Sequence, residues 1–219
     1  MKVTIKSAEE IKKMRRAGEI LAAVHQNLAR EIKPGMSTLD IDRLGEEMIR
    51  GYGCIPSFKN YCGYPASICV SVNEEAKLLI ERTRQSFIEG MKKAVAGNHL
   101  YDISAAIGDY ANQFGYGVVE DLCGHGIGSH LHEEPEIPNF RQSRFRRGIK
   151  LKPGMTLAVE PMINVGTKDV LWMDDEWTVV TEDKSLSAHY ENTILITDGK
   201  PEILSLTEEE KKAGFLNLF

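Results

Sequence analysis

The sequence predicts an α+β protein built from two helix–helix–sheet units, the first of which lacks the central strands of its sheet. Two pairs of amphipathic helical segments, a set of marker residues that repeats about 64 positions apart, and strand-like segments gathered after the second pair support this reading. We treat residues 1–219 as a single domain. Its shortened N-terminal unit covers residues 1–73 and its C-terminal unit covers residues 74–219.

The first helix pair is recognised by the residues at its ends. Ser7 and Glu10 have the spacing of a capping box, and apolar residues then recur every three or four positions as far as Pro34. Ser37 or Thr38 opens a second helix. We therefore predict two helices before the first glycine-rich stop.

The second pair repeats the markers of the first. Each pair begins with Glu-Glu, has an Asp-Ile pair near the start of its second helix and ends in Gly-Tyr-Gly. In the second pair these markers predict a helix starting at Glu74-Glu75 and another starting at Asp102. Three markers in the same order indicate an internal duplication.

Strand-like segments follow the two helix pairs very unequally. Only about 20 residues follow the first pair, and they contain one strand-like segment, Ala66–Val72. Four strand-like segments follow the second pair: Val118–Leu122, Thr156–Val165, Trp177–Thr181 and His189–Ile196. The first unit is therefore predicted to lack most of its own sheet.

The composition is that of a globular protein that acts in the cytoplasm. The net charge of −5 and the pI near 5.7 do not favour nucleic-acid binding. Four cysteines without a CxxC pair are read as reduced thiols. The N-terminus lacks the apolar core of a signal peptide, and no apolar run is long enough to cross a membrane.

The residues best suited to chemistry gather in Gly124–Pro135. Three histidines and two glutamates lie there among three glycines. Glycine costs about 1 kcal/mol per helical position, so we predict a loop rather than a helix. The alternative is a surface turn whose histidines are solvated.

Two further carboxylates lie inside strand-like apolar runs, at Glu160 and at Glu191. A buried carboxylate is costly unless it is paired or binds a metal. One imidazole from the Gly124–Pro135 stretch and these two glutamates would form a reasonable divalent-metal site. The alternative is a set of buried polar groups in ordinary hydrogen bonds.

Taken together, these motifs resemble those of the type I methionine aminopeptidases, which have the two-lobed "pita-bread" fold. The resemblance covers nearly the whole chain, which has neither the helical insert of the type II enzymes nor an N-terminal zinc-binding extension. The matching segments are Asn60–Pro65, Ser71–Glu74, Gly124–Gly128, Leu131–Pro135, Glu160–Met162 and Ser187–Thr193.

The resemblance implies removal of N-terminal methionine by water held between two divalent metals. It assigns metal binding to His125, Glu160 and Glu191, with Glu160 also carrying a proton and Glu191 bridging the metals. It assigns contact with the substrate amide and its developing charge to His132. The positions that match the methionine pocket are Tyr61, Tyr64, Cys69 and Trp177. Leu131 occupies a position of this pocket where the family often has an aromatic residue.

The chain departs from the family pattern after Glu74. Roughly 35 residues are absent there, including both aspartate ligands and the first catalytic histidine. One metal position keeps His125, Glu160 and Glu191, whereas the other keeps only Glu191. We therefore expect at most one ion per chain, from among Co, Mn, Fe and Zn.

Three functions follow from this pattern. The first is a metalloaminopeptidase that acts on peptide or nascent-protein N-termini, with the ribosome as a further partner. The second is a catalytically silent module that binds peptide N-termini or a protein partner. The third is a deletion product with no function of its own. We interpret His130 as solvent-facing and Arg141–Arg147 as a solvated face rather than a ribosome contact.

Overall fold

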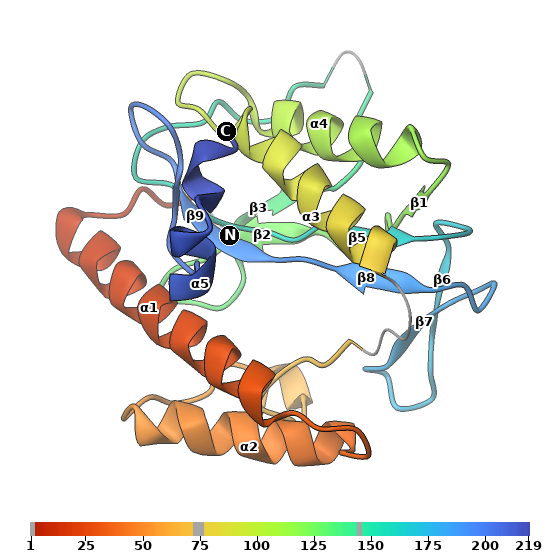
Figure 1. The fold of residues 1–219 in the computed structure, drawn as a ribbon. Coiled ribbons are helices and arrows are strands. Elements are labelled where there is room, and N and C mark those ends of the chain that lie inside the picture. The colour runs from red at the N-terminus through yellow and green to blue at the C-terminus, as the bar shows by residue number, and fades with distance from the viewer. Residues whose placement is uncertain (1–2, 72–76, 144–145) are drawn as a thin grey trace.

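The computed structural model describes residues 3–71, 77–143 and 146–219 (Figure 1). Its main helices are α1 (Ala8–Glu31), α2 (Thr38–Gly51), α3 (Lys77–Met91), α4 (Leu100–Asn112) and α5 (Glu208–Lys212), with short 3-10 turns η1 (Tyr61–Gly63) and η2 (Phe215–Asn217). Its strands are β1 (Gly117–Val118), β2 (Gly124–Gly126), β3 (Glu133–Ile137), β4 (Thr156–Val159), β5 (Met162–Asn164), β6 (Val170–Trp172), β7 (Val179–Thr181), β8 (Ser187–His189), β9 (Asn192–Leu195) and β10 (Glu202–Ile203).

The strands form antiparallel sheets. Five strands make the largest sheet, in the order β10-β9-β4-β2-β3, and three make a second, in the order β1-β5-β8. The pair β6-β7 forms a separate ribbon. In the described part of the chain no strand precedes Gly117, whereas the prediction gave the first unit one remaining strand of its sheet.

Helix starts were largely predictable from capping residues. The Ser7 side chain accepts from the Glu10 amide while the Glu10 carboxylate accepts from the Ser7 amide, as the capping box predicts. Ser37, not Thr38, caps α2 in the same way. Helix α4 begins at Leu100, slightly earlier than predicted, because Asp102 accepts from the amide of the preceding cap residue. The predicted start at Glu74-Glu75 lies outside the described residues.

Helices α3 and α4 cover one side of the sheets, while α1 and α2 lie on the other side (Figure 1). The main core forms where α3 and α4 meet the five-stranded sheet. Its fully buried members include Phe87, Ile88, Met91, Ile103, Ile107, Leu157, Val159 and Ile194. The C-terminal unit therefore supplies most of the apolar burial.

The predicted strand over Ala66–Val72 is wrong for residues 66–71, and residue 72 lies outside the described ranges. The buried Asp42 carboxylate of α2 accepts from the amides of Ser67 and Ile68, at 2.7 and 3.0 Å. A side chain thus satisfies the amides that a neighbouring strand would have paired.

The predicted strands around the two key carboxylates are interrupted at those carboxylates. Thr156–Val165 divides into β4 and β5 around Glu160-Pro161, and His189–Ile196 divides between β8 and β9 around Tyr190-Glu191. Proline has no amide to donate to a ladder, so Pro161 ends β4. The Tyr190 amide donates to the Pro161 carbonyl at 3.1 Å, which aligns the two breaks.

The two remaining predicted strands are shorter than expected. Val118–Leu122 contributes only the end of β1, and Trp177–Thr181 contributes β7. β7 pairs with β6 alone, and β1 lies at the edge of its sheet beside β5, so each of these strands has a single neighbour.

Candidate metal centre

The stretch Gly124–Pro135 forms most of a β-hairpin, so the predicted loop is wrong for its two ends. Strand β2 lies between β3 and β4 in the large sheet. A Cβ atom on Gly124 would lie 2.4 Å from the Ala158 oxygen, and one on Gly126 would lie 2.2 Å from the Glu134 oxygen. These glycines therefore serve close packing of neighbouring backbones around His125.

His125 presents one ring nitrogen to a carboxylate. Its Nδ1 lies 2.8 Å from the Gly126 carbonyl oxygen. A carbonyl can only accept, so the ring proton belongs on Nδ1 and Nε2 carries the free lone pair. Nε2 lies 3.5 Å from Oε1 of Glu160. This orientation leaves Nε2 available to bind a metal, which is the role that the sequence predicts for His125.

In the part of the chain that the structure describes, Glu160, His189 and Glu191 form a group of possible metal ligands. One ligand atom from each lies within 4.8 Å of the others. His189 Nε2 approaches Oε2 of Glu160 to 3.3 Å. Glu160 and Glu191 thus come together as predicted, while His189 had no predicted role.

A sequence signal for His189 was present. His189 and Glu191 are two residues apart at the end of a strand, and alternate residues of a strand point to the same face. The register between β5 and β8 then brings Glu160 to these two residues, because His189 pairs with Met162 and so lies beside Glu160. The first part of this signal is visible in the sequence, but the register is not.

The pKa values of Glu191 and His189 are shifted by burial and by the neighbouring carboxylates. Burial and the charge of Glu160 raise the pKa of Glu191 to about 7, although His189 acts in the opposite direction. Burial alone would lower the pKa of His189, but its hydrogen bond to Glu160 and the charges of both glutamates outweigh that effect and raise it. His189 and Glu191 still reach solvent. Two carboxylates and an imidazole that lie this close together are suitable ligands for a divalent cation, whose charge would offset the repulsion between the carboxylates.

His132 lies beside this group and contacts Tyr61. Its Nδ1 is 2.8 Å from the Tyr61 hydroxyl, and its ring packs edge-on against that of His125 at 4.2 Å. Burial and the neighbouring His125 lower the pKa of His132, against the influence of Glu160. His132 is therefore neutral near pH 7.

The predicted methionine-pocket residues lie near the same carboxylates. Tyr64 packs edge-on against Trp177 at 5.1 Å, and burial together with Cys69 raises the pKa of Tyr64 to about 12. Cys69 is exposed, yet partial loss of water and the charges of Glu191 and Glu160 raise the pKa of its thiol. The hydroxyl of Tyr61 contacts His132, which lies beside these carboxylates.

The exposed groups near the hairpin are ordinary surface residues. The side chain of His130 is 75% exposed, as predicted. Arg141 pairs with Asp109, and Arg147 lies 3.1 Å from Asp102. Both arginines are exposed, which agrees with a solvated face.

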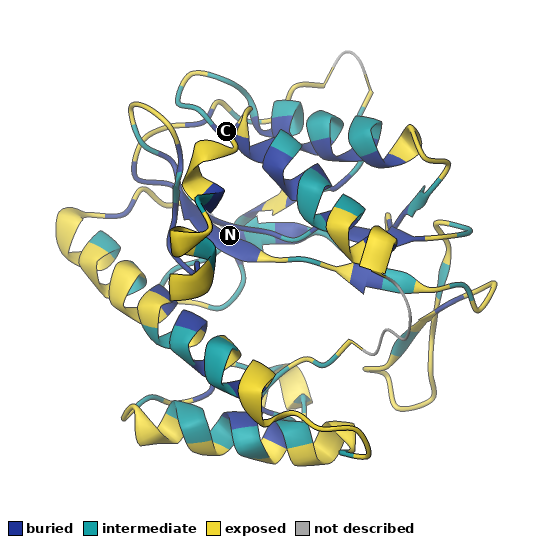
Figure 2. Ribbon diagram, viewed as in Figure 1, coloured by how far each residue is buried: buried dark blue, intermediate teal, exposed yellow. Residues whose placement is uncertain are grey.

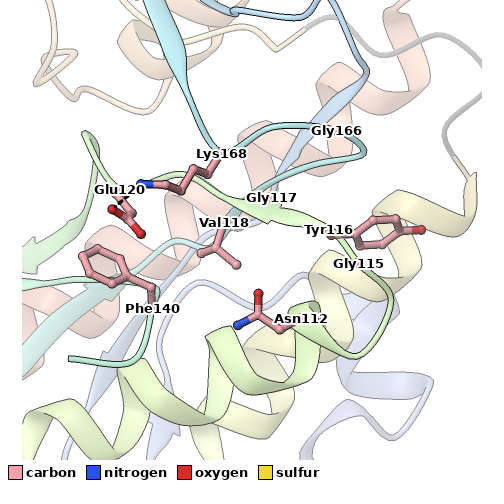
Figure 3. Close-up of a pocket in the computed structure, with 9 residues that line it drawn as sticks. All are labelled: Asn112, Gly115, Tyr116, Gly117, Val118, Glu120, Phe140, Gly166 and Lys168. Carbon is pink, nitrogen blue, oxygen red and sulfur yellow. Dashed lines mark hydrogen bonds and ion pairs between the residues drawn. The ribbon is translucent and has the colours of Figure 1, made fainter. Parts of the chain in front are cut away.

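A separate surface pocket lies beside α4 and β1 (Figure 3). It has a volume of about 250 Å³ and contains the ion pair between Lys168 and Glu120, at 2.7 Å. Its lining includes no predicted site residue. We therefore place the candidate centre at the carboxylate group instead.

Comparison with known proteins identifies the family. The model of metallopeptidase family M24 matches residues 12–77 and 72–198. The chain therefore belongs to metallopeptidase family M24. Across the described helices, none is long and apolar enough to cross a membrane.

Within this family the chain is similar to methionine aminopeptidases. That of Clostridium acetobutylicum is 44% identical over 251 residues, which cover 94% of this chain and 100% of the relative. The crystal structure of methionine aminopeptidase from Thermotoga maritima has a TM-score of 0.88 at 33% identity, covering 94% of this chain and 100% of that one. That from Rickettsia prowazekii has the same TM-score at 32% identity, with the same coverage. The predicted family and pita-bread fold are thus confirmed.

The comparisons also locate the shortening of the chain. The two family-model matches meet at residues 72–77, next to the predicted break after Glu74. The Clostridium alignment has 251 positions but covers 94% of 219 residues, about 206, so about 45 positions of that relative have no counterpart here. This is somewhat more than the predicted gap of roughly 35 residues.

Proposed function

We propose that this chain is a methionine aminopeptidase, which removes N-terminal methionine from peptides and nascent proteins. The observation that carries the proposal is the meeting of Glu160 and Glu191 with imidazoles, beside an aromatic cluster, in a chain of this family. Neither the carboxylates nor the aromatic residues alone would specify this reaction.

The donor set fits one divalent cation. His125, Glu160 and Glu191 would hold Co, Mn, Fe or Zn, since nitrogen and carboxylate donors suit all four. When bound, the cation supplies a Lewis acid and lowers the pKa of a water molecule. The family's aspartates have no counterpart in this chain, so we propose at most one ion per chain.

Glu160 and His132 are the proposed catalytic residues. Glu160 takes a proton from the attacking water and passes it to the departing amine. Nδ1 of His132 lies 2.8 Å from the Tyr61 hydroxyl, and in the proposed tautomer this hydroxyl donates to Nδ1 and the His132 proton lies on Nε2. That proton would donate to the substrate amide and stabilise the charge that develops there.

Four residues are proposed to recognise the substrate side chain. Tyr61, Tyr64, Cys69 and Trp177 offer aromatic and thiol surface close to the carboxylates. A methionine thioether makes favourable contacts with such rings, because sulfur is polarisable. A charged side chain would lose its hydration there without gaining a partner.

The test is methionine release from a Met-Ala-Ser peptide by the full chain with added Co²⁺. We expect release above the background of Co²⁺ alone, and we expect Glu160→Gln to reduce it by about 10²–10⁴-fold, because a general base is lost. Glu136→Gln is the matched control, since Glu136 is an exposed residue of β3. Absence of release by the wild-type chain would overturn the proposal.

A second candidate is a catalytically silent module that binds peptide N-termini or a protein partner. The shortening of the chain relative to its relatives favours it. Binding of the Met-Ala-Ser peptide without release would support this candidate over the enzyme.

The setting that we propose is the cytoplasm, with nascent proteins at the ribosome as substrates. All four cysteines are free thiols, which fits a reducing compartment.

A further inference from the structure

Two imidazoles flank the carboxylate of Glu160, one on each oxygen. His125 Nε2 lies 3.5 Å from Oε1, and His189 Nε2 lies 3.3 Å from Oε2. Because the proton of the neutral His125 ring lies on Nδ1, its Nε2 has no proton to donate to Oε1, so hydrogen bonding alone does not account for this approach. A shared cation would use both nitrogens instead.

The positions of His189, Glu160 and Glu191 nearly match those of ligands around one ion. Two donors bound to the same cation at about 2.0–2.2 Å can be at most about 4.4 Å apart. Their ligand atoms already lie within 4.8 Å of one another. A shift of a few tenths of an ångström would therefore bring these three donors to one cation.

The backbone fixes this placement. His189 ends β8 opposite Met162 of β5, and Glu191 precedes β9. Glu160 lies at the matching break between β4 and β5. The Tyr190–Pro161 hydrogen bond holds the two breaks together, so the donors converge from paired strands rather than from independent loops.

We propose that His189 is a direct ligand of the cation, which gives this chain a fourth protein ligand beside His125, Glu160 and Glu191. The inference rests on the proposed metal site. A neutral imidazole adds a ligand without adding charge, so the two glutamates alone balance a divalent ion. Two nitrogen donors also favour Co²⁺, Fe²⁺ or Zn²⁺ over Mn²⁺.

The experiment counts imidazoles around the metal. The full chain, stripped of metal, is titrated with Zn²⁺ and measured by X-ray absorption at the zinc edge, where imidazole rings give a distinct scattering pattern. We expect one ion per chain with two imidazoles. His189→Gln should leave one imidazole and weaken Zn²⁺ binding at least about tenfold, since even outer-shell partners of metal ligands contribute that much.

Two variants serve as controls. His130→Gln removes an exposed histidine from the same hairpin and should change neither the imidazole count nor the affinity. His189→Asp keeps a ligand at the position, and should retain affinity while losing one imidazole. Circular dichroism of each metal-free variant shows whether a weaker affinity reflects lost folding.

Three results would overturn the inference: a single imidazole in the wild-type chain, two imidazoles in His189→Gln, or no Zn²⁺ binding at all. The count is independent of turnover. Two imidazoles in a chain that releases no methionine would support His189 as a ligand and contradict the proposed function. Methionine release by a chain with a single imidazole would support the proposed function and contradict His189 as a ligand.

Discussion

At the scale of single residues, the ion pair of Lys6 with Glu133 joins the N-terminal segment to the hairpin. Both side chains are only 6% exposed, and Nζ lies 2.5 Å from Oε2. The Glu133 carboxylate also accepts from the Thr4 hydroxyl at 2.7 Å and from the His130 amide at 3.2 Å. Because Glu133 follows His132, this network fixes the hairpin next to a proposed catalytic residue.

This network predicts a specific dependence of stability on pH. Burial opposes ionisation of Glu133, but Lys6, Thr4 and the His130 amide outweigh it and lower its pKa from 4.5 to about 2. A carboxyl whose folded pKa is lowered stabilises the protein above its unfolded pKa. That contribution, up to about 3 kcal/mol, is lost as the pH falls from 4.5 towards 2.

Lys6→Met should therefore reduce the free energy of unfolding by about 3 kcal/mol at pH 7, because it leaves a buried carboxylate unpaired. The difference from wild type should shrink at pH 3. Urea unfolding at both pH values measures this, and Lys13→Met on the exposed face of α1 is the control. An equal loss at both pH values would contradict the assignment.

The candidate site could be predicted from sequence only in part. The prediction brought His125, Glu160 and Glu191 together. In the structure His125 lies 3.5 Å from Glu160, while the third member of the group that contains Glu160 and Glu191 is His189. His189 was missed because its closeness to Glu160 depends on how β5 and β8 pair. The Lys6–Glu133 contact joins residues 127 positions apart and leaves no local pattern.

At the scale of elements, local patterns predicted helices better than strands. Capping boxes at Ser7 and Ser37 act within one turn, so the sequence contains all of the information. Strand limits depend on partners instead. Ala66–Val72 has strand-like residues, but over residues 66–71 the amides of Ser67 and Ile68 bind Asp42.

The hairpin of β2 and β3 gives a prediction at this scale. Gly126→Ala would place a Cβ atom 2.2 Å from the Glu134 oxygen, a backbone atom that cannot rotate away. We expect a loss of about 2–3 kcal/mol in the free energy of unfolding, since overpacking forces the strands apart. Metal affinity should also fall, because His125 precedes Gly126.

Gly51→Ala is the control for this substitution. Gly51 ends α2, and a Cβ there would meet nothing within 4 Å. We expect a change between zero and a gain of about 1 kcal/mol, because alanine favours helix. Urea unfolding of both variants measures the contrast. A Gly126→Ala protein as stable as Gly51→Ala would show that the strands can separate at no cost.

At the scale of the whole molecule, the helices of the two units bury very different numbers of residues (Figure 2). Helix α2 buries only Asp42 and Gly45 of its residues, whereas α3 buries seven residues and α4 buries six. The Clostridium acetobutylicum relative has about 45 positions that this chain lacks, and the two family-model matches overlap at residues 72–77, between α2 and α3. The helix pair α1–α2 thus has less sheet to pack against than its counterpart α3–α4.

This asymmetry predicts that the α1–α2 pair opens locally before the rest of the protein. Amides in α2 should exchange with solvent through an opening of lower free energy than amides in α3 and α4, because fewer apolar contacts must be broken. Hydrogen exchange followed by mass spectrometry on the full chain measures this. We expect protection factors in α2 at least about tenfold lower, a difference of about 1.4 kcal/mol.

The five-stranded sheet supplies the internal reference, since β4 and β9 pair along their whole lengths and are fully buried. Their amides should exchange only with global unfolding, and so should those of α3 and α4. Equal protection in α2 and α3 would mean that the two units unfold as one. In that case the sparse contacts of α2 with α1 and with the Ser67 region would stabilise it as strongly as a packed core does.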